Sequence, residues 1–61
     1  MKKRFQIFTV YEGYITKTEY VSEIQAALTA ASIYWMDPEC LNVTIYDFKN
    51  KSTVLNYDRP D

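Results

Sequence analysis

The 61-residue chain contains no histidine, a single cysteine, a single glycine and two prolines. Without histidine it lacks the commonest general base and the commonest ligand of transition metals. One cysteine cannot form an internal disulfide or a zinc cluster, and it fits a reducing compartment. One glycine cannot supply the glycine-rich loop that cradles phosphate groups. These absences argue against an enzyme, and we expect neither a cofactor nor a metal site.

Long apolar segments are also missing from the sequence. No run approaches the roughly eighteen apolar residues that cross a bilayer, and the basic start of the chain lacks the unbroken apolar segment of a secretion signal. Net charge −1 and a pI near 5.2 give no overall attraction to nucleic acid. Yet 48% of the residues are hydrophobic and 16% are aromatic, which indicates a folded core. Residues 1–61 therefore predict one small cytoplasmic domain with no membrane partner.

Two stretches near the start, residues 4–11 and 14–20, are rich in β-branched and aromatic residues and flank a Glu-Gly pair. This pattern predicts two strands joined by a two-residue turn. Pairing across the turn sets Tyr11 against Tyr14, because a slip by one residue would place charged side chains beside apolar ones. The pairs that follow are Thr9 with Thr16, Ile7 with Thr18 and Phe5 with Tyr20.

Residues 22–38 have the boundaries of a helix. Ser22 is a capping residue with Gln25 three positions later, and Pro38 disfavours helical geometry at the residue before it. Between Ser22 and Met36 the only charged residue is Glu23. A surface helix normally carries a ladder of Glu and Lys on its outer face, so this helix is unusual.

The helix has two apolar faces at about 100° per residue. The larger side chains form one stripe, which we expect to pack on the sheet; it comprises Ile24, Ala27, Leu28, Ala31 and Trp35. The opposite face, expected to point outward, comprises Ala26, Thr29, Ala30, Ile33 and Met36. Either this outer face is an ordinary alanine-rich surface, or its first four residues contact another protein.

A second hairpin follows the helix. Residues 41–48 alternate apolar and polar side chains, and residues 52–57 form the next strand. A three-residue loop, 49–51, would place Leu55 on the same face as Ile45. We expect residues 58–61 to be a frayed tail.

Together these elements predict an α+β domain of order ββαββ, with a four-stranded sheet and one helix on one face. Composition allows the all-antiparallel strand order 2-1-3-4. The element order and lengths over residues 4–57, with the final TIYDFKNKSTVLNY hairpin, resemble the β-grasp layout of the immunoglobulin-binding domains of protein G. That resemblance implies the order 2-1-4-3, with the first and last strands parallel at the centre, and we prefer this order. It carries over no immunoglobulin binding, because the charged helix face of that family is missing here.

The sheet is expected to leave apolar residues on the face that the helix does not cover. In the order 2-1-4-3 Phe8 neighbours Val54, and the whole predicted patch comprises Phe8, Val10, Ile15, Tyr46, Phe48 and Val54. An uncovered apolar patch on a small domain indicates a contact surface. Charges are predicted to separate, with Lys2, Lys3, Arg4, Lys49 and Lys51 at a basic end and Glu12, Asp37, Glu39, Asp58 and Asp61 at the other.

We therefore expect a small non-enzymatic interaction module that binds another protein, or itself as a homodimer, through the outer face of the sheet or of the helix. Very short, intracellular, cysteine-poor proteins of this kind often come from phages and mobile elements, where they inhibit a host protein by occluding its site. The alternative is single-stranded nucleic-acid binding, with Phe8, Tyr46 and Phe48 stacking on bases, which the acidic pI disfavours. No small-molecule substrate is inferred.

Overall fold

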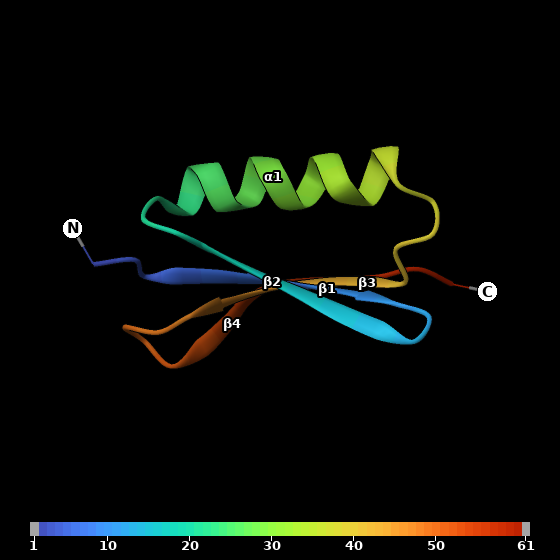
Figure 1. Ribbon diagram of the computed structural model, residues 1–61. Helices are drawn as coiled ribbons and strands as arrows, with labels where there is room; N and C mark the ends of the chain where they lie inside the picture. The colour runs from blue at the N-terminus through green and yellow to red at the C-terminus, as the bar shows by residue number, and fades with distance from the viewer. Residues whose placement is uncertain (1, 61) are drawn as a thin grey trace.

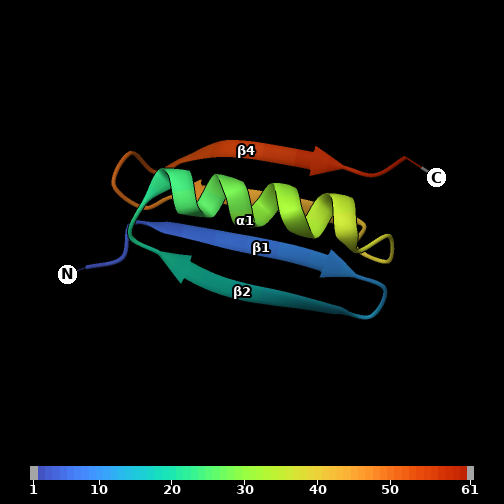
Figure 2. The ribbon, with the colours of Figure 1, turned by 90° about the horizontal axis from the view of Figure 1, so that it is seen from above.

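A computed structural model describes residues 2–60 and has two layers, a four-stranded sheet and one helix (Figure 1). The elements in chain order are β1 (Phe5–Tyr11), β2 (Tyr14–Tyr20), α1 (Glu23–Met36), β3 (Asn42–Asp47) and β4 (Ser52–Asp58). The helix lies across one face of the sheet, above its central strands (Figure 2). The predicted ββαββ order with one helix on one face is confirmed.

The strand order is β2-β1-β3-β4, and every neighbouring pair is antiparallel. The preferred order 2-1-4-3 is therefore wrong and the alternative 2-1-3-4 is correct. Burial agrees with this order: every second residue of β3 is buried, including Val43 and Ile45, whereas β4 has no buried residue. Strand β3 lies in the centre of the sheet, with β1 on one side and β4 on the other. Strand β4 has only one neighbouring strand and forms an edge.

The first hairpin has the predicted register, from Tyr11 opposite Tyr14 to Phe5 opposite Tyr20. Its turn contains Gly13 at φ 91°, a left-handed conformation that glycine adopts without steric cost. The predicted alignment of β1 and β2 is thus confirmed throughout.

The second hairpin differs in its loop. The loop covers residues 48–51, one more than predicted, and it ends with Lys51 at φ 54°. A β-bulge then leaves Val54 without a partner between the pairs Ile45–Leu55 and Tyr46–Thr53. The bulge compensates for the longer loop, so Leu55 pairs with Ile45 and lies on the same face, as predicted.

The helix begins and ends near the predicted residues. The Ser22 hydroxyl accepts a hydrogen bond from the Gln25 backbone N–H at 3.4 Å, and the helix ends at Met36. The last turn has no basic residue of its own, but the Arg59 guanidinium donates to the backbone carbonyls of Tyr34 and Asp37. This contact gives the Tyr34 carbonyl in the last turn of the helix a hydrogen-bond donor, and it places a positive charge at the helix end. The fraying expected of residues 58–61 stays a prediction, and Asp61 lies outside the described residues.

The predicted orientation of the helix is wrong. Ala26 and Ala30, assigned to the outer face, are fully buried against the sheet, and Ile33 packs against the same core. The core residues that complete this layer are Phe5, Ile7, Cys40, Val43 and Ile45. Because the sheet fills most of the space between the layers with large side chains, small helical residues fit closely against it.

Candidate interaction surfaces

The largest apolar side chains of the helix point away from the sheet. Ile24 is 72% exposed, Leu28 67% and Trp35 79%. Together with Ala31 they lie at intervals of four, three and four residues, which places them along one line of the helix surface. We call these four residues the outer helix stripe. No other segment of residues 2–60 passes over it (Figure 2).

The borders of the outer helix stripe are uncharged. The helix has one charged residue, Glu23 in its first turn. Gln25 and Ser32 lie on one flank, and Met36, 81% exposed, lies at the end of the helix with its sulfur 3.6 Å from the Ser32 hydroxyl. Ala27 and Tyr34, on the other flank, pack partly on the core. The stripe is therefore an apolar surface with a neutral rim.

The outer face of the sheet is less continuous than predicted. Because β3 separates β1 from β4, Phe8 lies between Lys17 and Thr44, and its predicted contact with Val54 is wrong. The Lys17 ammonium lies 5.9 Å from the centre of the Phe8 ring. Further along β1, Val10 pairs with the exposed Ile15.

A polar ladder occupies the β3–β4 side of this face. The Thr44 hydroxyl donates to the Asn42 side-chain oxygen at 2.7 Å, and the Asn42 amide donates to Asn56 at 2.7 Å. Tyr46 and Phe48 form a separate aromatic pair, with ring centres 5.6 Å apart. The predicted sheet patch is thus divided into two small apolar clusters with polar side chains between them.

The N-terminal segment and the β3–β4 loop lie together at one end of the sheet and carry most of the residues assigned to the basic end. Lys2, Lys3, Arg4, Phe48 and Lys49 line a shallow hollow of about 330 Å³. The segments are joined there by a hydrogen bond from the Phe48 backbone N–H to the Arg4 carbonyl at 2.9 Å. Lys51 is exposed in the same loop.

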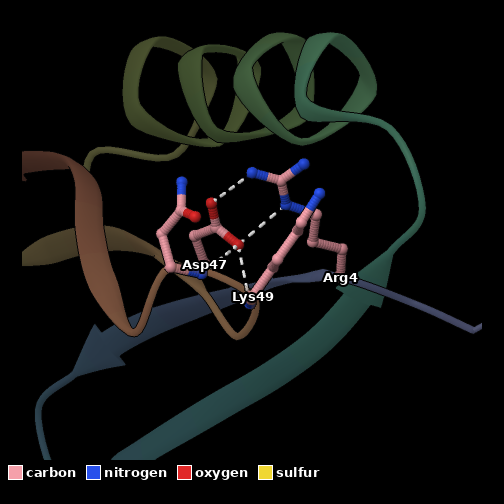
Figure 3. Close-up of polar contacts among 4 residues, drawn as sticks. Arg4, Asp47 and Lys49 are labelled. Carbon is pink, nitrogen blue, oxygen red and sulfur yellow. Dashed lines mark hydrogen bonds and ion pairs between the residues drawn. The ribbon is translucent and has the colours of Figure 1, made fainter.

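Arg4 has a structural partner within this end. Its guanidinium binds the buried Asp47 carboxylate through two hydrogen bonds of 2.9 and 2.7 Å, and Asp47 also accepts the Lys49 backbone N–H at 2.9 Å (Figure 3). The Arg4 hydrogen bonds, and then those from the backbone, lower the pKa of Asp47 to about 2. The positive charge of Arg4 is therefore balanced internally, and the lysines supply the free charge of the hollow.

The opposite end is acidic within the described residues; Asp61 lies outside them. Tyr11, Glu12, Tyr14 and Glu39 line a second hollow of about 290 Å³. The Tyr11 hydroxyl donates to the Asp37 carboxylate at 2.8 Å, and this hydrogen bond is the main cause that raises the pKa of Tyr11 to about 12. Asp37 thus ties β1 to the end of the helix.

Reactive side chains are few in the structure. Cys40 is fully buried, and its thiol donates to the Asn42 backbone carbonyl at 3.3 Å. Among residues 2–60, no group of three or more Cys, Asp or Glu side chains is placed to hold a metal ion. Over the same residues, no helix is both long and apolar enough to cross a membrane.

No protein-family model matches this chain, and comparison with curated proteins and with solved structures finds no significant match. The surface itself therefore has to indicate the function. The sequence pattern groups the residues of the outer helix stripe together, but their large side chains predict that they pack in the core. The informative signal was the pair Ala26 and Ala30, four residues apart, which offers a flat face for close packing on a sheet.

Proposed function

We propose that this chain is a small protein-interaction module that binds through the outer helix stripe. The exposure of Ile24, Leu28 and Trp35 along one line supports this proposal most strongly. Scattered exposed apolar residues are common, but a contiguous group of this size on a small domain indicates a contact site. Covering a surface of another protein, as an inhibitor does, is one function that such a module serves.

The helix surface is favoured over the outer sheet face. The sheet face is interrupted by the Thr44 and Asn42 hydrogen bonds and by Lys17 over Phe8. Its apolar clusters are also partly covered, since Phe8 and Tyr46 are only half-exposed. Tryptophan, by contrast, is enriched among the residues that dominate binding energy in protein interfaces. Trp35 lies in the outer helix stripe and is 79% exposed.

A comparison of two charge insertions tests this proposal. The chain, Leu28→Glu and Ile15→Glu are each immobilised and exposed to extract of the cells in which the protein is made. Both sites are exposed, so both variants keep the fold and differ only in which face is altered. We expect the unmodified chain and the Ile15→Glu variant to retain a binding protein from the extract, and the Leu28→Glu variant to lose it. Leu28→Glu should also lose binding to that partner after the partner has been purified.

Binding that survives Leu28→Glu but is abolished by Ile15→Glu would assign the function to the sheet face instead. If neither substitution affects binding to any protein, including the chain itself, the interaction function is wrong.

Single-stranded nucleic-acid binding is a second candidate, supported by the basic hollow with Phe48 in its wall. An aromatic ring beside several lysines suits a base and its phosphates. Titration with a fluorescent oligonucleotide at low and moderate salt tests it, with Lys2→Glu/Lys49→Glu as the variant. Salt-dependent binding lost in that variant would support this function, and the absence of binding at low salt would exclude it.

A further inference from the structure

We propose, building on the interaction function above, that the partner of the outer helix stripe is a second copy of this chain. The two helices would pack antiparallel about a two-fold axis, at the level of Thr29 and Ala30. Each copy then contributes the same surface, as in most symmetric dimers.

The spacing of the stripe suits helix-to-helix packing. Ile24, Leu28, Ala31 and Trp35 alternate steps of four and three residues. This is the pattern by which two helices form a shared apolar seam. A sheet or an irregular partner surface would not require it. The stripe runs almost the whole length of the 14-residue helix, which spans about 21 Å.

Side-chain volumes are complementary in the antiparallel arrangement. With the axis at the level of Thr29 and Ala30, Leu28 of each copy faces Ala31 of the other, and Ile24 faces Trp35. Large side chains then meet smaller ones along the seam, and close packing follows. In a parallel pair Trp35 would face Trp35 of the other copy, and Ala31 would face Ala31. The two helices would then be crowded at Trp35 and leave a gap at Ala31.

Charge also favours a second copy. Because an isologous interface sets the same surface of two copies together, a rim with charges of one sign would meet like charge across it. Here the stripe has a neutral rim, and Glu23 lies at the outer end of the seam, beside Met36 of the other copy. The antiparallel arrangement also sets the helix dipoles in opposite directions.

The available area is sufficient for a dimer of moderate affinity. With roughly 100–200 Å² exposed on each of Ile24, Leu28, Trp35 and Met36, burial of most of it gives about 500 Å² per copy. The pair would bury about 1,000 Å² in total, the lower limit for a specific interface. Because this area is at the lower limit, we expect a monomer–dimer equilibrium that depends on protein concentration.

Sedimentation velocity over a concentration series is the first test. We expect the mass to rise from 7.2 kDa toward twice that value as the concentration rises. Fluorescence of Trp35, the single tryptophan, should shift to shorter wavelength over the same range, because the dimer buries its ring. A monomer at every concentration, or growth beyond a dimer, would overturn the proposal.

Substitutions then assign the face. Leu28→Glu should weaken the dimer by about 30-fold or more, as loss of a central contact does. Ile15→Glu, an equivalent charge on the sheet, should change the dissociation constant by less than about threefold. The reverse pattern would show a dimer through the sheet and overturn the helix seam. Far-ultraviolet circular dichroism verifies that both variants are folded.

A swap tests the register within the seam. Leu28→Ala and Ala31→Leu should each weaken the dimer, because one leaves a cavity and the other overpacks. The double variant exchanges the two facing side chains and should restore much of the affinity. If the double variant is as weak as the two losses combined, the antiparallel register is wrong.

The outcomes separate this inference from the broader function. A strictly monomeric chain that still binds another protein through Leu28 would overturn the dimer and keep the interaction function. A chain with neither self-association nor Leu28-dependent binding would overturn both.

Discussion

The two faces of α1 reverse the usual distribution of side-chain size. The inner face offers Ala26 and Ala30, both fully buried, while the outer face offers Leu28 and Trp35 in solvent. The sheet beneath explains this, since its own large side chains fill the layer and leave room only for small helical ones. In a two-layer domain, large apolar residues of a helix are therefore available for a partner when the sheet provides the core volume.

Polarity is reversed in the same way. Under the helix the structure buries Thr9 and Asp47, whereas the outer helix stripe is apolar. The buried polar groups have partners: Thr9 contacts the Thr16 hydroxyl, and Asp47 binds Arg4. Among residues 2–60 no buried side-chain nitrogen or oxygen lacks a hydrogen bond. Polar groups are tolerated inside because each one is paired.

The largest effect is expected from enlarging the inner face. Ala30→Leu should lower the free energy of unfolding by about 2–3 kcal/mol, because the added atoms have no space between helix and sheet. Urea denaturation measures the change. A loss below about 0.5 kcal/mol would mean that Ala30 does not face the core, and the comparison of the two faces would fail.

Acid should reveal the paired carboxylate beneath the helix. The pKa of Asp47 is lowered from 3.8 to about 2 in the folded state, so its stabilisation is complete above pH 3.8 and is lost as the pH falls toward 2. Asp47→Asn should remove this part of the pH dependence of the urea midpoint. Asp58→Asn, at an exposed site, should leave it unchanged. An unaltered acid profile in Asp47→Asn would contradict the pairing with Arg4.

At alkaline pH the Tyr11–Asp37 contact should behave in the opposite sense. The pKa of Tyr11 is raised from 10.0 to about 12, so the stabilisation by its protonated hydroxyl is present below pH 10 and is lost between pH 10 and 12. Tyr11→Phe should reduce the alkaline loss of stability, and Tyr46→Phe should not. Spectroscopic titration of tyrosinate absorbance in the two variants assigns the late-ionising group.

Shortening the outer face should have the smallest effect on the fold. Leu28→Ala should change the free energy of unfolding of the monomer by less than about 0.5 kcal/mol, because its side chain is 67% exposed. The measurement is made in dilute protein, where dimerisation contributes nothing. A buried leucine would lose about 2–5 kcal/mol instead, and such a loss would place Leu28 in the core.

Local signals in the sequence were sufficient for the elements themselves. The Glu-Gly pair before Tyr14 predicted the first hairpin and its register, and Ser22 and Pro38 predicted the ends of the helix. These features depend on residues close in the chain, where turn chemistry and capping decide the conformation. The alternation of Val43 and Ile45 likewise predicted which side of β3 is buried.

Long-range arrangement was harder to predict. The strand orders 2-1-3-4 and 2-1-4-3 both bury the same face of β3. The alternation of apolar and polar residues therefore does not show whether β3 or β4 is the neighbour of β1. The order 2-1-4-3 follows from a resemblance in layout, and the structure differs from it by placing β3 beside β1 and β4 at the edge. The extra loop residue and the bulge at Val54 cancel each other, so the pattern of apolar residues did not show them.

The predicted helix site, Ala26, Thr29, Ala30 and Ile33, is wrong in its membership, because Ala26 and Ala30 are buried and Ile33 packs on the core. Ile24, Leu28 and Trp35 were grouped correctly on one line, but their size was taken to indicate the core. When a helix has apolar residues on two faces, their periodicity shows which residues share a face. It does not show which of the two faces packs on the sheet. Direction depends on how much volume the sheet supplies, and this depends on contacts such as Phe5 and Ile45 with the helix layer.

Collisional quenching of Trp35 tests the outward orientation of the helix most directly. In the Leu28→Glu variant and in dilute protein, the single tryptophan should emit at long wavelength and be quenched by acrylamide nearly as readily as free tryptophan, because 79% of its surface is exposed. The contrary result is emission at short wavelength with strong protection from acrylamide, both in the monomeric Leu28→Glu variant and in the dilute unmodified protein. It would contradict this orientation and place Trp35 against the sheet.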